Sequence, residues 1–222
     1  MRHVRGSPAV QAVANLYDRY LRSLQRYPVT TKSLTAASVG AAGDALAQLL
    51  ERRQRTPTAE RLGDPGPQKP FNWRRLVLFA TFMGVFSAPV SHYWYLWLSK
   101  RFPATNMVAV SKRVACDQLL MAPTIIPATL FFLEYAGRKF VAGENGDGLL
   151  RHALQVASEE TGRTLLANWT IWPIAQVVNF RFVRNELQVL FANLVGVGWN
   201  TFLSLVAAEN LQKSHKTLTK AD

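Results

Sequence analysis

The chain has 222 residues, of which 26 are lysine or arginine and 14 are aspartate or glutamate, so its net charge is +12. The basic residues flank apolar stretches, which favours anionic lipid headgroups over nucleic acid as the partner of this charge, and we expect no nucleic-acid binding. The single cysteine, Cys116, excludes an internal disulfide and any zinc site that needs several cysteines.

The first 27 residues predict a basic amphipathic helix, since they contain five arginines and one acid. Apolar side chains recur at the spacing of one helix face, at Val10, Val13, Tyr17, Leu21 and Leu24. Such a helix is typical of a mitochondrial presequence or of a helix that lies on a membrane surface. A proline directly after this segment should end the helix.

Five apolar, charge-poor segments follow. They cover residues 33–50, 76–99, 115–135, 164–180 and 187–208. Because about 20 apolar residues in a helix cross the hydrocarbon core, the sequence predicts an all-α fold. We expect an integral membrane helical bundle with four or five spanning helices plus amphipathic surface helices. A soluble helical bundle is the alternative.

Prolines inside these segments support the membrane interpretation. They are Pro89, Pro123, Pro127 and Pro173. In a membrane, neighbouring helices can satisfy the carbonyls that a proline frees, whereas a helix in water is strongly destabilised.

The domain organisation follows from composition. Residues 1–27 form the basic segment, residues 28–208 form the bundle, and residues 209–222 form a polar tail. Within the bundle, residues 51–70 are rich in proline, glycine and charge, which predicts a flexible linker. An amphipathic helix should begin near Leu149. The early loops are basic on both sides of the bundle, so the positive-inside rule leaves the orientation open.

Polar side chains inside the apolar segments form stripes with small residues, and these are the candidate pore or helix-seam residues. The candidates are Asp44, Gln48, His92, Asp117, Gln118, Trp169, Trp172, Pro173, Gln176, Asn179, Asn193 and Asn200. Such stripes fit both a close helix seam and a narrow aqueous path, and packing is the commoner explanation for any one residue.

Two positions in these stripes carry sharper expectations. Asp44 lies near the middle of its segment, so its carboxylate should pair with a cation, become protonated or contact water. Gly196 lies between Asn193 and Asn200, and we expect a seam there that has no room for a side chain.

Motifs that carry catalysis are missing from the sequence. There is no Walker A pattern, no G-x-S-x-G, no H-E-x-x-H and no histidine set with metal-ligand spacing. We therefore expect that the protein is not an enzyme and that it needs no cofactor and no metal. Residues 143–148, Gly-Glu-Asn-Gly-Asp-Gly, resemble an ion loop but lack the ligand series of a calcium site and are interpreted as a turn.

A set of short motifs resembles one known family over residues 20–204. The motifs are Tyr20, Tyr27-Pro28, Thr30, Gly43-Asp44, Gln48, Pro89, His92, Trp94-Tyr95, Asp117-Gln118, Ala122-Pro123, Trp169-x-x-Trp172-Pro173-x-x-Gln176-x-x-Asn179-Phe180 and Trp199-Asn200-x-x-Leu203-Ser204. In order and spacing they resemble the family of the twenty-two-kilodalton peroxisomal membrane protein and its mitochondrial inner-membrane relative, Mpv-seventeen. The chain departs from the family pattern at Arg184, where a proline is usual, and at Gln188, where an arginine is usual.

The resemblance implies a small integral membrane protein of mitochondria or peroxisomes, with four spanning helices by convention. It implies a pore or transport-related protein for small solutes that contributes to mitochondrial metabolite homeostasis. The expected location is the mitochondrial inner membrane, with the peroxisomal membrane as alternative. The expected partners are anionic lipid and small solutes, and a homo-oligomer is left open. The alternative function is a non-conducting membrane scaffold.

Overall fold

Helices and short loops make up the part of the chain that a computed structural model describes, residues 7–53, 70–146 and 148–199. No strand occurs in these ranges, which confirms the all-α class. The elements are α1 (Pro8–Arg26), α2 (Pro28–Arg53), α4 (Trp73–Thr81), η1 (Phe82–Ser87), α5 (Ala88–Arg101), α6 (Met107–Cys116), η2 (Asp117–Met121), α7 (Ala122–Ala136), η3 (Gly137–Ala142), α8 (Leu149–Phe182) and a last helix, Gln188–Trp199.

Three of these elements, η1, η2 and η3, are π-helical and join their neighbours into two long helices. One long helix runs from Trp73 to Arg101 and the other from Met107 to Ala142. Both are long and apolar enough to cross a membrane, and little of either is buried within the chain. In the described residues the structure therefore gives two candidate spans, and the count of four or five is not confirmed.

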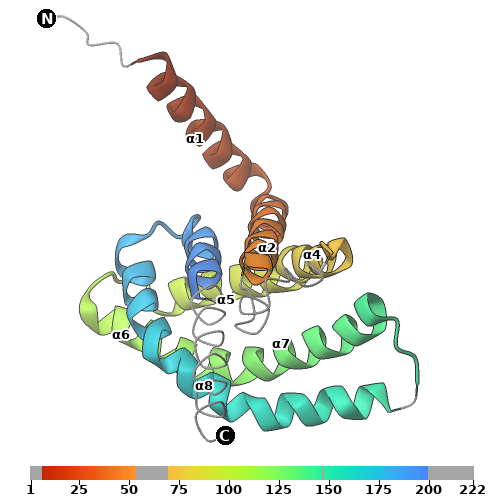
Figure 1. Ribbon diagram of the computed structural model, residues 1–222. Coiled ribbons are helices and arrows are strands. Elements are labelled where there is room, and N and C mark those ends of the chain that lie inside the picture. Colours follow the sequence, from red (N-terminus) through yellow and green to blue (C-terminus); the bar gives the residue numbers. More distant parts are fainter. Residues whose placement is uncertain (1–6, 54–69, 147, 200–222) are drawn as a thin grey trace, which may run out of the picture.

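Helix α1 stands apart from the bundle and points away from it (Figure 1). It ends at Arg26, as Tyr27-Pro28 predicts, and α2 begins at Pro28, where a fixed φ and a missing N–H suit the first turn of a helix. The side chains of Val10, Val13 and Leu16 are 61–69% exposed, so the first half of the apolar face of α1 is uncovered within the described residues, whereas Leu24 near its end is buried.

Helices α7 and α8 run side by side along one edge of the bundle, while α2 packs against α4 and η1 (Figure 1). The amphipathic helix predicted near Leu149 and the apolar segment 164–180 are one continuous helix, α8, with Pro173 inside it. Of segment 187–208, the structure describes the portion up to Trp199.

Glycines bring α2 and η1 into close contact. A Cβ at Gly84 would lie 2.9 Å from the backbone oxygen of Ser33, and one at Gly40 would lie 2.7 Å from Cγ of Met83. Real Cβ contacts are essentially never that short. Small residues therefore let these two helices approach each other, as the predicted seams require.

Candidate pore-lining cavity

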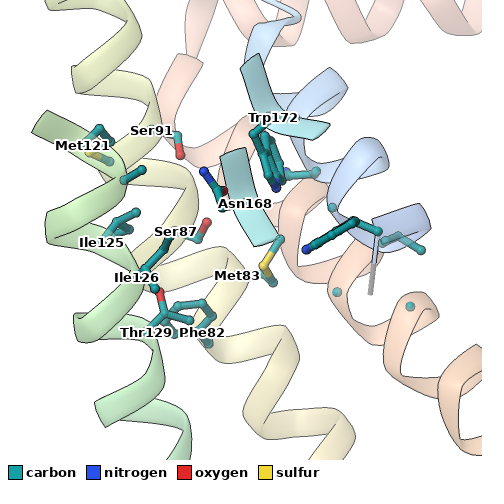
Figure 2. A pocket seen from close by; sticks show the side chains of 18 of the residues that line it. Phe82, Met83, Ser87, Ser91, Met121, Ile125, Ile126, Thr129, Asn168 and Trp172 are labelled. Atoms are coloured by element: carbon teal, nitrogen blue, oxygen red, sulfur yellow. The ribbon is translucent and has the colours of Figure 1, made fainter. Parts of the chain in front are cut away.

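A cavity of about 550 Å³ lies between the helices of the bundle. Its walls come from α2, from η1 and α5, from η2 and α7, from α8 and from the last helix. Figure 2 shows Ser87, Ser91 and Asn168 together near the middle of this space, with Ile125 and Ile126 of α7 on one side. The lining is mostly apolar, and its few polar groups come from several different helices.

The π-helical turns help to shape this cavity. Segment η1 ends just before Pro89 and segment η2 just before Pro123. Proline cannot donate the usual helical hydrogen bond, and a π turn is a common local adjustment that widens a helix at functional positions. These turns carry Phe82, Met83 and Asp117, which line the cavity.

Asp117 is the centre of a buried polar network. Its Oδ1 accepts a hydrogen bond from Nε1 of Trp94 at 2.9 Å. Its Oδ2 accepts from Nε2 of Gln118 at 2.9 Å and from Nε2 of Gln176 at 2.8 Å. The Gln176 amide also donates to the Tyr95 hydroxyl at 3.1 Å. The carboxylate thus has three donors, which offset the cost of burying it.

The network extends along α8 in both directions from Gln176. Toward its end, Nδ2 of Asn179 donates to Oε1 of Gln176 at 2.9 Å, and Asn179 is fully buried. Gln188, at the start of the last helix, donates to the backbone oxygen of Asn179 at 3.4 Å. Toward the start of α8, Nδ2 of Asn168 donates to Oε1 of Gln118 at 3.0 Å.

A second charged group lies at the α2–α4 side of the cavity. Oδ1 of Asp44 lies 2.7 Å from Nε of Arg75, and Arg75 also donates both terminal nitrogens to Glu51 at 3.0 Å. Nε2 of Gln48 donates to Oδ2 of Asp44 at 2.7 Å and to the backbone oxygen of Asn72. Oε1 of Gln48 accepts from the backbone N–H of Asn72. Of the three expectations for Asp44, the structure shows pairing with a cation.

Several polar groups around the cavity remain without hydrogen bonds in the described residues. The hydroxyls of Ser87, Ser91 and Thr129 line the cavity and donate to no protein acceptor within that part of the chain. Nδ2 of Asn193 is buried without a partner. A buried group such as Nδ2 of Asn193 is costly unless water or a solute satisfies it, and the half-buried hydroxyls can be reached by water or solute in the cavity.

Other predicted residues lie at the margins. Nδ1 of His92 accepts a hydrogen bond from Nζ of the buried Lys32 at 3.1 Å, away from the cavity. Trp172 lines the cavity, whereas Trp169 is 40% exposed and reaches the backbone oxygen of Gln118 at 3.3 Å. Pro173 is half-buried within α8.

The last helix corrects one expectation. Among the described residues, a Cβ at Gly196 would meet no atom within 4 Å, because this glycine lines the cavity and not a tight seam. Asn200 lies outside the described residues.

Sequence reasoning missed the partners of its own candidates. It singled out Asp44 but not Arg75, which begins the next long helix, and it gave no role to the cavity hydroxyls or to Asn168. One signal could have pointed to Arg75. It is a basic residue at the end of an apolar helix, and a linker connects that helix to the segment that contains Asp44.

Comparison with known proteins places the chain among membrane proteins. A family model described as Mpv17 / PMP22 family matches residues 148–204, which include α8. Peroxisomal membrane protein 2 of Bos taurus is 32% identical over 84% of this chain and 87% of its own length. Protein SYM1 of Gibberella zeae is 33% identical over 86% of this chain and 96% of its own length. PXMP2/4 family protein 3 of Dictyostelium discoideum is 32% identical over 86% and 90%.

No solved structure matches the chain. The name of the Bos taurus relative is that of a peroxisomal membrane protein, which is one of the two locations that the motifs imply. The similarity of the relatives extends over most of this chain and most of each relative, and the range that the family model matches contains α8. The chain therefore belongs to the Mpv17/PMP22 family of organelle membrane proteins.

Proposed function

We propose that the chain forms a path for small solutes across an organelle membrane and contributes to mitochondrial metabolite homeostasis. The observation that carries this proposal is the cavity, whose walls present Ser87, Ser91, Thr129 and Asn193 with unused hydrogen-bonding groups. Water or a polar solute in the cavity would satisfy them, whereas lipid would not. At about 30 Å³ per water, the space holds on the order of 15 to 20 waters.

The proposal includes further spans. At 1.5 Å per residue, α2 would be about 39 Å long and α8 about 51 Å, enough to cross a hydrocarbon core of about 30 Å. Buried polar residues lower the hydropathy of α2 and of the second half of α8 and face other helices or the cavity. The first half of α8 carries exposed charges such as Glu159 and Glu160, so the proposed span in α8 is its apolar part, residues 164–180, about 26 Å long. We count α2 and α8 with the two apolar helices as four spans, and the last helix as the start of a fifth. The proposed path involves no enzymatic step, and a homo-oligomer stays an open alternative to a path within one chain.

The mitochondrial inner membrane is the location that we favour, and the peroxisomal membrane is the alternative. Helix α1 supports this choice, because it combines the exposed apolar side chains of Val10, Val13 and Leu16 with Arg19, Arg22 and Arg26. A helix of this composition binds anionic membrane surfaces and is typical of mitochondrial import signals.

A non-conducting scaffold is the competing function. The tight glycine contacts between α2 and η1 and the satisfied carboxylate of Asp117 favour it, because both are features of a rigid packed bundle. A scaffold needs no hydrated cavity, so solute flux separates the two functions.

Flux of small solutes from liposomes that contain the purified protein tests the proposal. Ser91→Phe would place a large ring in the cavity, and we expect it to slow solute release at least about tenfold. Val85→Phe is the matched control, since the Val85 side chain is 75% exposed on the outside of η1 and does not line the cavity. Release from wild-type liposomes that equals release from empty liposomes would support the scaffold. If Ser91→Phe and Val85→Phe slowed solute release equally, solutes would not be passing through this cavity.

A further inference from the structure

A basic pocket lies outside the cavity, where the end of α2 meets the start of α4. Its lining includes Arg52, Arg74 and Arg75 together with Phe71 and Trp73. Arg75 is already neutralised by Asp44 and Glu51. Arg52 and Arg74 form no ion pair within the described residues, while Glu51, which also lines the pocket, pairs with Arg75.

The aromatic rings place the pocket at the level of a membrane surface. Trp73 is 62% exposed and is the first residue of the apolar helix Trp73–Arg101, and Phe71, two residues before it, is 41% exposed. Exposed tryptophan at the start of a span is typical of the boundary between hydrocarbon and water. The guanidinium of Arg52 lies 5.6 Å from the Phe71 ring and that of Arg74 lies 5.8 Å from the Trp73 ring, so the rings help to hold both arginines.

The start of α4 adds donors of the kind that bind phosphate. Asn72 caps the helix by accepting from the backbone N–H of Arg75. The N–H groups of Trp73 and Arg74 have no helical acceptor at this position and make no other hydrogen bond in the described part of the chain. Backbone N–H groups of a first turn beside arginine side chains are a common phosphate-binding arrangement.

We propose that this pocket binds the phosphate headgroup of an anionic phospholipid. The two unpaired arginines supply the charge, the first turn of α4 supplies directed donors, and Trp73 and Phe71 contact the upper acyl chains. A lipid fits better than a soluble phosphate compound, because the arginines lie next to exposed aromatic side chains and to the start of an apolar helix. These apolar surfaces can contact acyl chains, which a soluble phosphate compound lacks. Basic pockets between helices at a membrane surface recognise such headgroups. This inference does not depend on solute conduction.

Thermal unfolding of the full chain in detergent micelles, at constant ionic strength, tests the site. Phosphatidylglycerol added to the micelles should raise the melting temperature, because a ligand that binds only the folded protein stabilises it. Arg52→Gln/Arg74→Gln should weaken the apparent affinity by roughly 30-fold, since each arginine at an anionic surface contributes about fivefold. Arg52→Lys/Arg74→Lys keeps the charge, so its affinity for phosphatidylglycerol should lie between that of the wild type and that of the glutamine variant.

The matched control is Lys100→Gln/Arg101→Gln, which removes the same charge at the other end of the same long helix. Arg101 also lies over a ring, that of Phe102, at 5.4 Å, but neither Lys100 nor Arg101 lines the basic pocket. This control should respond to phosphatidylglycerol as the wild type does. Equal losses in the two glutamine variants would overturn the proposal, as would an equal shift with phosphatidylcholine or with inorganic phosphate alone. A lysine variant as weak as the glutamine variant would also contradict it.

Discussion

Gln176 and Asp117 lie 59 residues apart in the chain, yet the Gln176 amide donates to the Asp117 carboxylate at 2.8 Å. This bond joins α8 to η2 beside the cavity, and both side chains are almost fully buried. Because Gln176 also contacts Tyr95 and Asn179, one side chain connects three helical segments of the bundle.

Gln176→Leu should destabilise the folded protein. The leucine leaves Oδ2 of Asp117 with one donor in place of two and removes the acceptor of Asn179. Leaving a buried polar group unsatisfied costs about 1–3 kcal/mol, and more when the group is charged. Thermal unfolding in detergent measures the loss. Ile174→Leu is the control on the same helix, because Ile174 is 70% exposed. A Gln176→Leu variant as stable as the control would show that the network contributes nothing to stability.

Asp44→Asn should also lower stability, because it leaves Arg75 with Glu51 as its only acidic partner in the described residues. A double variant, Asp44→Asn/Arg75→Gln, also removes the cation that Asp44 pairs with in the wild type. The double variant should therefore be less destabilised than the sum of the two single variants by about 1 kcal/mol or more, as expected for side chains in contact. Strictly additive effects in this double-mutant cycle would mean that the pair does not interact in solution.

Gly84→Ala should destabilise the contact between α2 and η1 by roughly 1–3 kcal/mol, because the new methyl group overlaps the backbone of Ser33. Gly196→Ala is the matched control, since a methyl group there meets open space. Alanine is the better helix former, so the control should be neutral or slightly stabilising. Unfolding temperatures of the two variants in the same detergent make the comparison. A higher unfolding temperature for Gly84→Ala than for Gly196→Ala would contradict the close packing of η1 against α2.

Helix α1 should direct the protein to mitochondria. Exchange of Arg19, Arg22 and Arg26 for glutamate reverses the charge of its polar side and should weaken localisation of a fluorescent fusion of the full chain. Exchange of the same residues for lysine keeps the charge and is the control. A peroxisomal pattern for the wild-type fusion would reverse the choice of organelle. A normal mitochondrial pattern for the glutamate variant would place the address in the bundle.

Part of this structure follows from the sequence alone. The four-residue step of Ala36, Gly40, Asp44 and Gln48 predicts one buried face of α2, and all four are buried. The Tyr27-Pro28 boundary between α1 and α2 is equally local, since proline fixes the backbone wherever it stands. Periodicity and proline act within a few residues, which is why a single sequence carries them.

The cavity and its ion pair did not follow from the sequence. Whether Asp44 meets Arg75 depends on the relative height of two antiparallel helices, and the length of the linker between them does not fix that height. The π turns at Phe82–Ser87 and Asp117–Met121 leave no clear residue pattern except the proline that follows each. The space at Gly196 exists because several helices fail to close around it, which is a property of the whole bundle.

The central claim is that the cavity is hydrated when the protein is in a membrane. Ser91→Cys, in a Cys116→Ser background, places one thiol among the polar groups of the cavity wall. In reconstituted liposomes, a small water-soluble thiol reagent should label this cysteine, and a permeating solute should slow the labelling. A Val85→Cys control should react with a lipid-soluble reagent instead, because Val85 is on the outer surface of η1. Labelling of Ser91→Cys by the lipid-soluble reagent alone would contradict the account.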